Sequence, residues 1–330
     1  MYNREVSLIS NFIKDASLDL SGVSILLEIG SGHFIWSPII AYYAGAKAIL
    51  CIIRDSKWGA AASIKEQFFS LCVAVGADIN AFKIYNQTIE AIEDADIVMS
   101  MGFVRPLNSD VLSKTKKDAV VSLLVEPWEV RISDVDIEYM QRNHIPFCGT
   151  NEQHESMKIF EYVGLLTIKL LLDKGISTIN SNFLVISSRP FLDFVCKYLQ
   201  ACGGNILSMQ NDCDNCDAVI VAEQGSVSSV WNILSPNQKN KIVNNKIPII
   251  HISGEIDKEI CNILGNQKYP EGYYPPQVMT KTTDYVGPDP VIKLHAGAMK
   301  AAEILWREFQ ITKEPKLSQQ KAVNSGWALI

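Results

Sequence analysis

Polar and charged residues follow the apolar runs in the first half of this sequence, where the strands of a parallel sheet would end. Carboxylates at such positions can transfer protons, and arginines can hold an anionic group. Carboxyl ends of parallel strands share one edge of a sheet, so we predict that these residues form one substrate site. The predicted catalytic residues are Glu126 and Glu129, and the predicted substrate-binding residues are Arg105, Arg131, Thr150, Asn151, Glu152 and His154. Solvated strand ends, with Glu126 and Glu129 paired to Arg131, are the alternative interpretation.

A glycine turn forms a second candidate site. The run Leu27-Glu28-Ile29-Gly30-Ser31-Gly32 resembles the first motif of class I methyltransferases, and the resemblance implies S-adenosylmethionine as a cofactor. Asp55 lies slightly beyond the place where those enzymes carry a ribose-binding acid. The same glycines suit a dinucleotide turn without its third glycine, in which Arg54 meets a phosphate. A tight turn without a ligand is the third interpretation. The predicted cofactor-binding residues of this region are Gly30, Ser31, Gly32, Arg54 and Asp55.

These residues must be positioned by an α/β framework. Continuously apolar runs alternate with amphipathic segments, which predicts doubly wound, Rossmann-like parallel sheets covered by helices on both faces. The pattern occurs twice and is separated by one long apolar helix that ends at Gly175. We therefore predict two Rossmann-like domains joined by an interdomain helix. The expected segments are residues 1–150 for the first domain, 151–176 for the helix, 177–290 for the second domain, and 291–330 for a C-terminal helix and tail that return to the domain junction.

A wider resemblance covers about two thirds of the chain. The runs Asp94-Ala-Asp-Ile-Val, His144-Ile-Pro-Phe-Cys-Gly-Thr-Asn-Glu, Ile249-Ile-His-Ile-Ser-Gly-Glu-Ile-Asp and His295-Ala-Gly-Ala look like the D-2-hydroxyacid dehydrogenases. The NAD-binding adenosylhomocysteine hydrolases look similar at a greater distance. The resemblance implies a nicotinamide cofactor, NAD or NADP, and makes His295 the catalytic acid or base. We expect a carboxylate near His295 to raise the pKa of its imidazole. The alternative interpretation is a partly buried, structural histidine satisfied by one backbone partner.

Two departures from that family concern its main motifs. The turn that should carry the glycine fingerprint of the second domain reads Ser187-Ser188-Arg189-Pro190-Phe191-Leu192, and Ser253 stands where the family has its catalytic arginine. Ser187 and Ser188 occupy the cofactor-binding positions, but an arginine and a leucine replace glycines that let a pyrophosphate approach. We therefore expect weak or displaced dinucleotide binding there. The Gly30-Ser31-Gly32 turn is the better nucleotide candidate.

Composition limits the remaining functions. The chain of 330 residues has a net charge of −6 and no basic stripe, which argues against nucleic acid as a partner. We expect no membrane span and a cytoplasmic location, with a small molecule as the partner and a homodimer left open. The eight cysteines lie mostly in apolar runs and are expected as free thiols. Cys213 and Cys216 lack the further ligands that a structural zinc requires, so no metal is expected.

The leading hypothesis is an NAD(P)-dependent oxidoreductase that acts on a small polar metabolite in an interdomain cleft. A methyltransferase that uses the Gly30-Ser31-Gly32 turn is the first alternative. A non-catalytic two-domain protein that binds a metabolite is the second.

Overall fold

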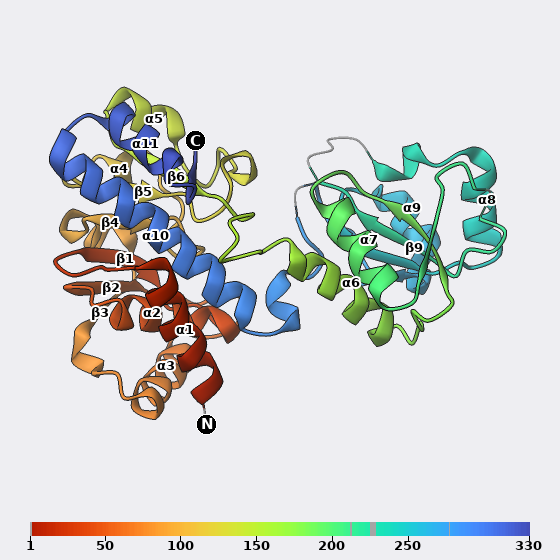
Figure 1. Ribbon diagram of the computed structural model, residues 1–330, viewed down its shortest axis with the longest axis horizontal. Coiled ribbons are helices and arrows are strands. Elements are labelled where there is room, and N and C mark those ends of the chain that lie inside the picture. The colour runs from red at the N-terminus through yellow and green to blue at the C-terminus, as the bar shows by residue number, and fades with distance from the viewer. Residues whose placement is uncertain (1, 212, 225–228, 277) are drawn as a thin grey trace. The chain divides into compact units, whose positions relative to one another are not determined.

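The computed structural model describes residues 2–211, 213–224, 229–276 and 278–330. These residues divide into two compact units (Figure 1). Residues 1–158 and 288–330 form the first unit, and residues 159–287 form the second. The chain thus enters the second unit once and returns to complete the first.

The first unit is built on a seven-stranded sheet with the order β3-β2-β1-β4-β5-β6-β12. Its first six strands are parallel, because successive apolar strands are joined through helical crossovers. β12 is antiparallel to β6. The strands are β1 Ser24–Glu28, β2 Ala48–Ile52, β3 Phe82–Tyr85, β4 Ile97–Met99, β5 Val120–Ser122, β6 Phe147–Thr150 and β12 Ala328–Leu329.

The helices of the first unit come from both ends of the chain. α10 is the longest, and it packs against α1, α2, β4, β5 and β6 as it crosses the sheet (Figure 1). The α-helices are α1 Asn3–Ala16, α2 Ser37–Tyr43, α3 Ala61–Val75, α4 Ser109–Leu112, α5 Ile137–Arg142, α10 Asp289–Thr312 and α11 Pro315–Asn324. The 3-10 helices are η1 Gly32–Trp36, η2 Ile79–Ala81, η3 Thr88–Glu90, η4 Ile92–Asp94 and η5 Pro127–Glu129.

The second unit has a five-stranded parallel sheet with the order β11-β10-β9-β7-β8. Its strands are β7 Asn182–Ile186, β8 Asn205–Leu207, β9 Ala218–Ala222, β10 Ile249–Ser253 and β11 Lys268–Tyr269. Its helices are α6 Glu161–Asp173, α7 Phe191–Ala201, α8 Pro236–Asn244, α9 Lys258–Leu264, η6 Val230–Ile233, η7 Gly265–Gln267 and η8 Thr283–Val286. Two α/β units with parallel, Rossmann-like sheets confirm the predicted fold class.

The helix predicted between the domains is shorter than expected. α6 begins at Glu161, whereas residues 151–158 form turns in which His154 N–H donates to Asn151 O and Met157 N–H donates to His154 O. Lys158 has a φ of 50°, which an α-helix cannot contain. α6 belongs to the second unit, where it packs along α7. The apolar periodicity predicted the helix but not its start.

The C-terminal tail adds structure that the sequence analysis missed. Residues 315–324 form α11, although their polar composition did not predict a helix. The apolar end that follows pairs as β12 with the edge strand β6, with Ala328 opposite Thr150 and Leu329 opposite Gly149. The tail therefore docks on its own chain and covers an edge that would otherwise leave backbone groups unpaired.

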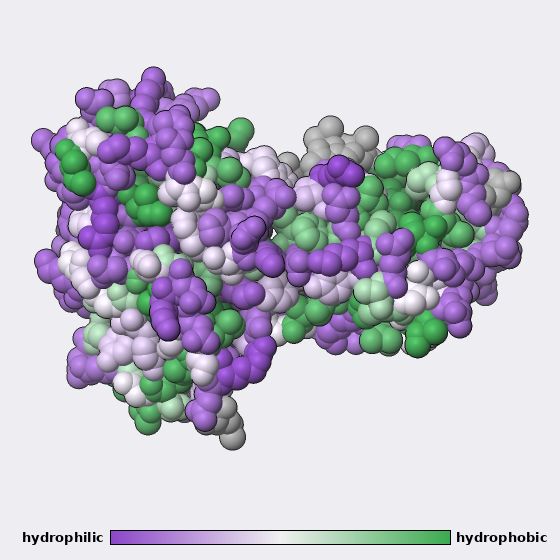
Figure 2. Space-filling model, in the orientation of Figure 1, coloured by the Kyte–Doolittle hydropathy of each residue, from purple (hydrophilic) through white to green (hydrophobic). Residues whose placement is uncertain are grey.

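The surface of both units is mixed. Figure 2 shows hydrophilic residues over much of the visible face of each unit, with separate hydrophobic areas between them. Among the described residues, no helix is long and apolar enough to cross a membrane.

Candidate functional site

The turn after β1 is organised by a buried carboxylate. Glu28 ends the strand with 7% of its surface exposed, and its Oε2 accepts a hydrogen bond of 2.5 Å from the Phe103 amide. A Cβ added to Gly30 would lie 3.2 Å from Glu28 Oε1, and one added to Gly102 would lie 3.3 Å from Oε2. Burial raises the pKa of Glu28, whereas the Phe103 amide and the Arg105 and Arg54 charges oppose that rise. Glu28 thus ties the ends of β1 and β4 together.

The Gly30-Ser31-Gly32 turn leads directly into η1 and α2. Gly30 is closely packed, because a Cβ there would lie 2.5 Å from Phe34 Cβ. Gly32 has a φ of 58°, with open space where a side chain would stand. Ser31 precedes η1 and makes no side-chain cap, so the first amides of the helical segment have no capping side chain. Such amides favour anionic groups, including phosphates.

Arg54 and Asp55 follow β2, the strand beside β1. Glu28 pairs with Ile52, so Arg54 lies about level with Gly30 along the neighbouring strand. Asp55 Oδ1 accepts a hydrogen bond of 2.8 Å from Ala61 N–H and thereby caps the start of α3. Arg54 Nη2 donates to Arg105 O at 2.9 Å, and its buried Nε has no partner within the described part of the chain. The arginine is therefore held beside the turn with donor capacity to spare.

The two arginines predicted to hold a substrate anion share a partner. Arg105 Nη1 lies 2.8 Å from Asp134 Oδ2, and Arg131 Nε lies 3.1 Å from the same oxygen. The predicted pairing of Arg131 with Glu126 or Glu129 is thus not the one found. An anionic ligand at either guanidinium would compete with Asp134.

Glu126, Glu129 and Glu152 form one carboxylate cluster, and we use this name for the three side chains. Close packing of η5 against β6 brings them together, since a Cβ on Gly149 would lie 2.5 Å from Pro127 Cδ and 2.8 Å from Val125 O. The Glu129 and Glu152 carboxyl groups interact with each other and with the Glu126 charge. Buried carboxyl groups so close together favour the protonated form.

Burial and repulsion between the carboxylates raise the pKa of two members of the cluster. Burial raises the pKa of Glu129 to about 7, with the Glu126 charge adding to the rise and the interaction with Glu152 opposing it. The pKa of Glu152 is raised well above its usual range, first by burial and then by the Glu129 and Glu126 charges. Both carboxyl groups therefore hold a proton more tightly than an exposed glutamate does. A raised pKa of this kind suits an acid or base working near pH 7.

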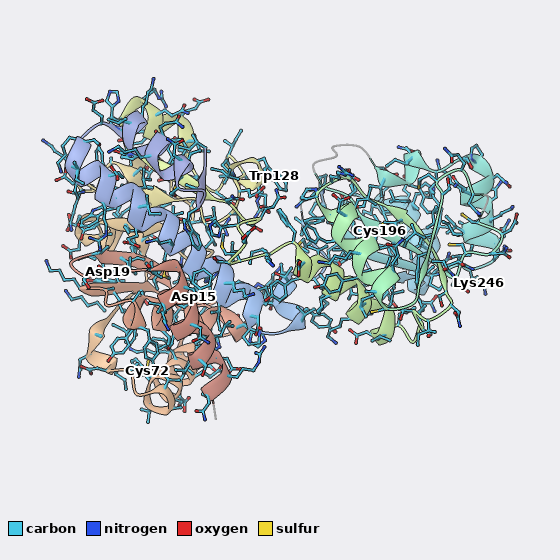
Figure 3. The ribbon with its side chains drawn as sticks, in the orientation of Figure 1. Asp15, Asp19, Cys72, Trp128, Cys196 and Lys246 are labelled. Carbon is cyan, nitrogen blue, oxygen red and sulfur yellow. The ribbon has the colours of Figure 1, made fainter. Side chains whose placement is uncertain are left out.

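Two further groups border the carboxylate cluster. Trp128 Nε1 donates to Glu126 Oε2 at 2.7 Å, and the indole is 44% exposed on the loop after β5 (Figure 3). Thr150 is fully buried, and its amide bonds to Val125 O. Three acceptor atoms here are buried and have no partner among the described residues: Glu126 Oε1, Glu129 Oε1 and Thr150 Oγ1. Buried oxygens without partners are costly, so a bound donor would relieve them.

Asn151 and His154 serve the C-terminal tail. Asn151 N–H donates to Trp327 O, and Asn151 Nδ2 donates to Gly326 O at 2.8 Å. The His154 ring stacks on the Trp327 indole with centroids 3.7 Å apart. Their predicted substrate-binding roles lack support in this geometry, because the tail occupies both side chains. The apolar ending of the sequence was the only signal that could have shown this.

His295 lies away from the predicted charge partners. It is 1% exposed in α10, its Nδ1 is hydrogen-bonded to Ser37 Oγ, and Phe34 packs on the ring. The expected rise in its pKa is wrong, because burial lowers the pKa to about 3 and no described carboxylate opposes that effect. The geometry therefore supports a neutral histidine that packs α10 on α2.

The turn after β7 in the second unit has a different construction. Ser187 Oγ donates to Ala222 O at 2.6 Å, and Ser188 Oγ donates to Glu223 Oε1 at 2.7 Å. Pro190 has no amide hydrogen, and Leu192 N–H is bonded to Ser188 O. Phe191 is buried against Phe160. Both serines predicted to bind a cofactor thus hold this turn to the neighbouring strand.

No metal site is evident in the described part of the chain, where no group of three or more His, Cys, Asp or Glu side chains is arranged to hold an ion. Neither Cys213 nor Cys216 forms a disulfide, and burial raises the pKa of Cys216 to about 12. A thiol with so high a pKa is a poor nucleophile and metal ligand at neutral pH.

Comparison with solved structures places the fold. A dipicolinate synthase subunit from Bacillus halodurans superposes with a TM-score of 0.53 at 11% identity, over 84% of this chain and 96% of that one. The corresponding Bacillus subtilis protein superposes with a TM-score of 0.51 at 12% identity, over 88% of this chain and 99% of that one. The chain shares their two-domain fold. Rhodotorula graminis D-mandelate dehydrogenase matches with a TM-score of 0.37 at 8% identity, over 78% of this chain and 94% of that one.

Sequence comparisons match one part of the chain. Residues 189–267 match the model of an uncharacterised protein family, UPF0180. No curated protein sequence matches the chain. At these identities the structural likeness concerns the fold, so function must be argued from the site.

Proposed function

We propose that this protein is an NAD(P)-dependent oxidoreductase that acts on a small polar metabolite, with its nucleotide along the carboxyl edge of the first sheet. The observation that carries the proposal is the strand order. Read from β3 to β6, the first sheet has the order 3-2-1-4-5-6 of dinucleotide-binding Rossmann folds, and the Gly30-Ser31-Gly32 turn lies at its switch point between β1 and β4. Ligands of such sheets bind at that point.

The two halves of this sheet suit the two halves of a dinucleotide. The glycine turn and Arg54 lie at β1 and β2, the half that holds the adenosine and pyrophosphate in such folds. The carboxylate cluster follows β5 and β6, on the half that holds the nicotinamide. β5 is two strands from β1, or about 10 Å. A dinucleotide is long enough to span both features.

The residues on the nicotinamide half would accept or donate the substrate proton that accompanies hydride transfer. A bound nicotinamide supplies hydride transfer, which converts an alcohol or amine to a carbonyl or imine, or the reverse. The raised pKa of Glu152 favours its protonated form, in which it can stabilise a Glu129 carboxylate beside it. Glu129, with a pKa of about 7, takes or returns the proton of the substrate oxygen or nitrogen. In this proposal the acid–base role passes from His295 to Glu129.

A methyltransferase is the second candidate, and the Glu28-Ile29-Gly30-Ser31-Gly32 turn favours it. That function would place S-adenosylmethionine at the same glycines and gives the carboxylate cluster no defined task. Glu28 favours neither function, since its carboxylate is bonded to the Phe103 amide.

Thermal unfolding separates the candidates. Purified protein is heated alone and with NAD, NADH, NADP, NADPH, S-adenosylmethionine or S-adenosylhomocysteine, since a ligand that binds the folded state raises Tm. Nicotinamide absorbance is then followed with a panel of 2-hydroxy, 2-oxo and 2-amino acids. A nicotinamide nucleotide that raises Tm and is turned over supports the oxidoreductase. A rise with S-adenosylmethionine alone overturns it, and nucleotide binding without turnover of any panel member favours a non-catalytic binding protein.

A further inference from the structure

The loop after β2, residues 54–59, carries groups that the proposed catalysis does not use. We call it the β2 loop. In Rossmann sites an acidic residue near the end of the second strand binds the ribose hydroxyls of NAD, whereas an arginine there accommodates the 2′-phosphate of NADP. The β2 loop reads Arg54-Asp55-Ser56-Lys57-Trp58-Gly59 and contains both kinds of residue. The contacts of Asp55, Arg54 and Lys57 show which kind of nucleotide the β2 loop favours.

One oxygen of the acidic residue is used within the protein. Asp55 Oδ1 accepts the Ala61 amide at 2.8 Å, and Ala60, the residue before α3, makes no side-chain cap of its own. Asp55 Oδ1 thus caps a helix of 15 residues, and a ribose hydroxyl would have to share this oxygen or bind the other carboxylate oxygen. Asp55 thus acts as the cap of α3, and its sequence position slightly beyond the usual ribose acid agrees with that role.

Two basic residues lie in the same loop. Arg54 is fixed by one bond from Nη2 to Arg105 O, and its Nε has no partner among the described residues. Lys57 is exposed and lies over the Trp58 ring at 4.8 Å from its centroid. Neither cation forms a salt bridge with a described carboxylate. Two cations beside one acid give the loop a positive charge in a chain whose net charge is negative.

An exposed aromatic ring completes the β2 loop. Trp58 is 72% exposed, and the loop is held in a tight turn by Ser56 and Gly59, whose backbones bond to each other. Ser56 Oγ further accepts the Trp58 amide at 3.1 Å. A large ring held in water by a fixed turn offers a stacking surface for a purine. The turn therefore presents a ring and a cation together.

We propose that the β2 loop selects NADP(H) over NAD(H), with Arg54 and Lys57 binding the 2′-phosphate of the adenosine ribose and Trp58 stacking on the adenine. The selection rests on the proposed nucleotide site in the first unit. It is electrostatic in origin, so it weakens as salt screens the exposed charges. Nothing in it depends on the substrate or on the carboxylate cluster.

Binding of nucleotide fragments tests the selection without catalysis. Calorimetric titration compares NADPH with NADH, and 2′,5′-ADP with 5′-AMP and 3′,5′-ADP. We expect at least tenfold tighter binding of NADPH than NADH, and of 2′,5′-ADP than either other fragment. Equal binding of 2′,5′-ADP and 3′,5′-ADP would identify a general phosphate site and overturn the selection. Equal binding of NADPH and NADH would do the same and leave the proposed function standing.

Variants locate the effect. Lys57→Ala should reduce the preference for NADPH several-fold while changing NADH affinity by less than twofold, and Arg54→Gln should reduce the preference as well. Lys47→Ala is the matched control, because this exposed lysine precedes the opposite end of the same strand. Arg54→Gln also removes the hydrogen bond to Arg105 O and can destabilise the loop. Lys57 is exposed, so Lys57→Ala tests the preference without disturbing the fold. An unchanged preference in Lys57→Ala with intact NADPH binding contradicts the assignment. Failure of all nucleotides to bind overturns the proposed function as well.

Discussion

The turns after β1 and β7 occupy the same topological place in their units and are built in opposite ways. Each follows the first strand of a parallel sheet and leads into a helix. Glycines form the first turn, leave space at Gly32, and leave the opening amides without a capping side chain. Serine hydroxyls bind the second turn to β9 and its loop, and Pro190 supplies no amide.

This difference shows that a strand-turn-helix unit survives the loss of its glycines when side chains replace ligand-facing amides with internal hydrogen bonds. The second turn keeps its position because Ser187 bonds to Ala222 O. It loses the free, unobstructed backbone that a pyrophosphate needs. The two sheets also differ in order, since the second reads 2-1-3-4-5 from β8 to β11. The two turns therefore share a place in the architecture but not the glycines that a dinucleotide turn uses.

The largest effect should come from Glu129. Glu129→Gln removes the proton acceptor of the proposed nicotinamide half but keeps the shape of the side chain. We expect turnover of an identified substrate to fall about 100-fold or more, with nucleotide affinity changed little. Steady-state rates and NADPH titrations measure the two quantities separately. Glu138→Gln on exposed α5 is the control, and equal losses in both variants would refute a role for the carboxylate cluster.

Gly30→Ala should weaken nucleotide binding at least tenfold. The new Cβ would stand 2.5 Å from Phe34 Cβ and 3.2 Å from Glu28 Oε1, so the turn must shift, at a stability cost of about 1–3 kcal/mol. Fluorescence titration of folded protein measures the affinity. Gly164→Ala is the matched control in the second unit, where a Cβ would stand 2.5 Å from Tyr198. If Gly164→Ala weakened nucleotide binding and Gly30→Ala did not, the second unit and not the first would be the one that binds nucleotide.

The carboxylate cluster should make stability depend on pH with a defined sign. The folded-state pKa of Glu129 is raised from 4.5 to about 7, so the folded state binds the proton more tightly than the unfolded state. This contribution is fully present below pH 4.5 and is lost as pH rises to 7. Chemical unfolding should show wild type losing about 1–3 kcal/mol over that window relative to Glu129→Gln. If the free energy of unfolding changed equally with pH in both proteins, the raised pKa of Glu129 would be contradicted.

Substitutions at the second turn should have the smallest effect. Ser188→Ala removes the bond to Glu223, and Arg189→Gly removes an exposed side chain paired only with Asp193 among the described residues. Both should change NADPH affinity by less than twofold, since the proposed nucleotide site lies in the other unit. A tenfold loss in either variant would show that the second turn binds nucleotide despite its missing glycines.

The sequence predicted the features that local patterns control. Apolar runs and their following polar residues identified both sheets, the Gly30-Ser31-Gly32 turn and the members of the carboxylate cluster. Apolar periodicity could not predict that Glu129 and Glu152 raise each other's pKa, because their proximity depends on η5 packing against Gly149. Asn151 and His154 were assigned to substrate because nothing local indicates that Trp327 returns to them. His295 was assigned by resemblance, and its buried position between α10 and α2 is a tertiary property.

Hydrogen exchange with NADPH tests the central claim, that nucleotide binds the first unit and not the second. Amide exchange of the whole chain is compared with and without saturating NADPH, since bound ligand protects the amides it contacts. We predict protection of residues 29–37 and of the β2 loop, with residues 187–192 unchanged. Protection confined to residues 187–192 would contradict the account and return the nucleotide to the second unit.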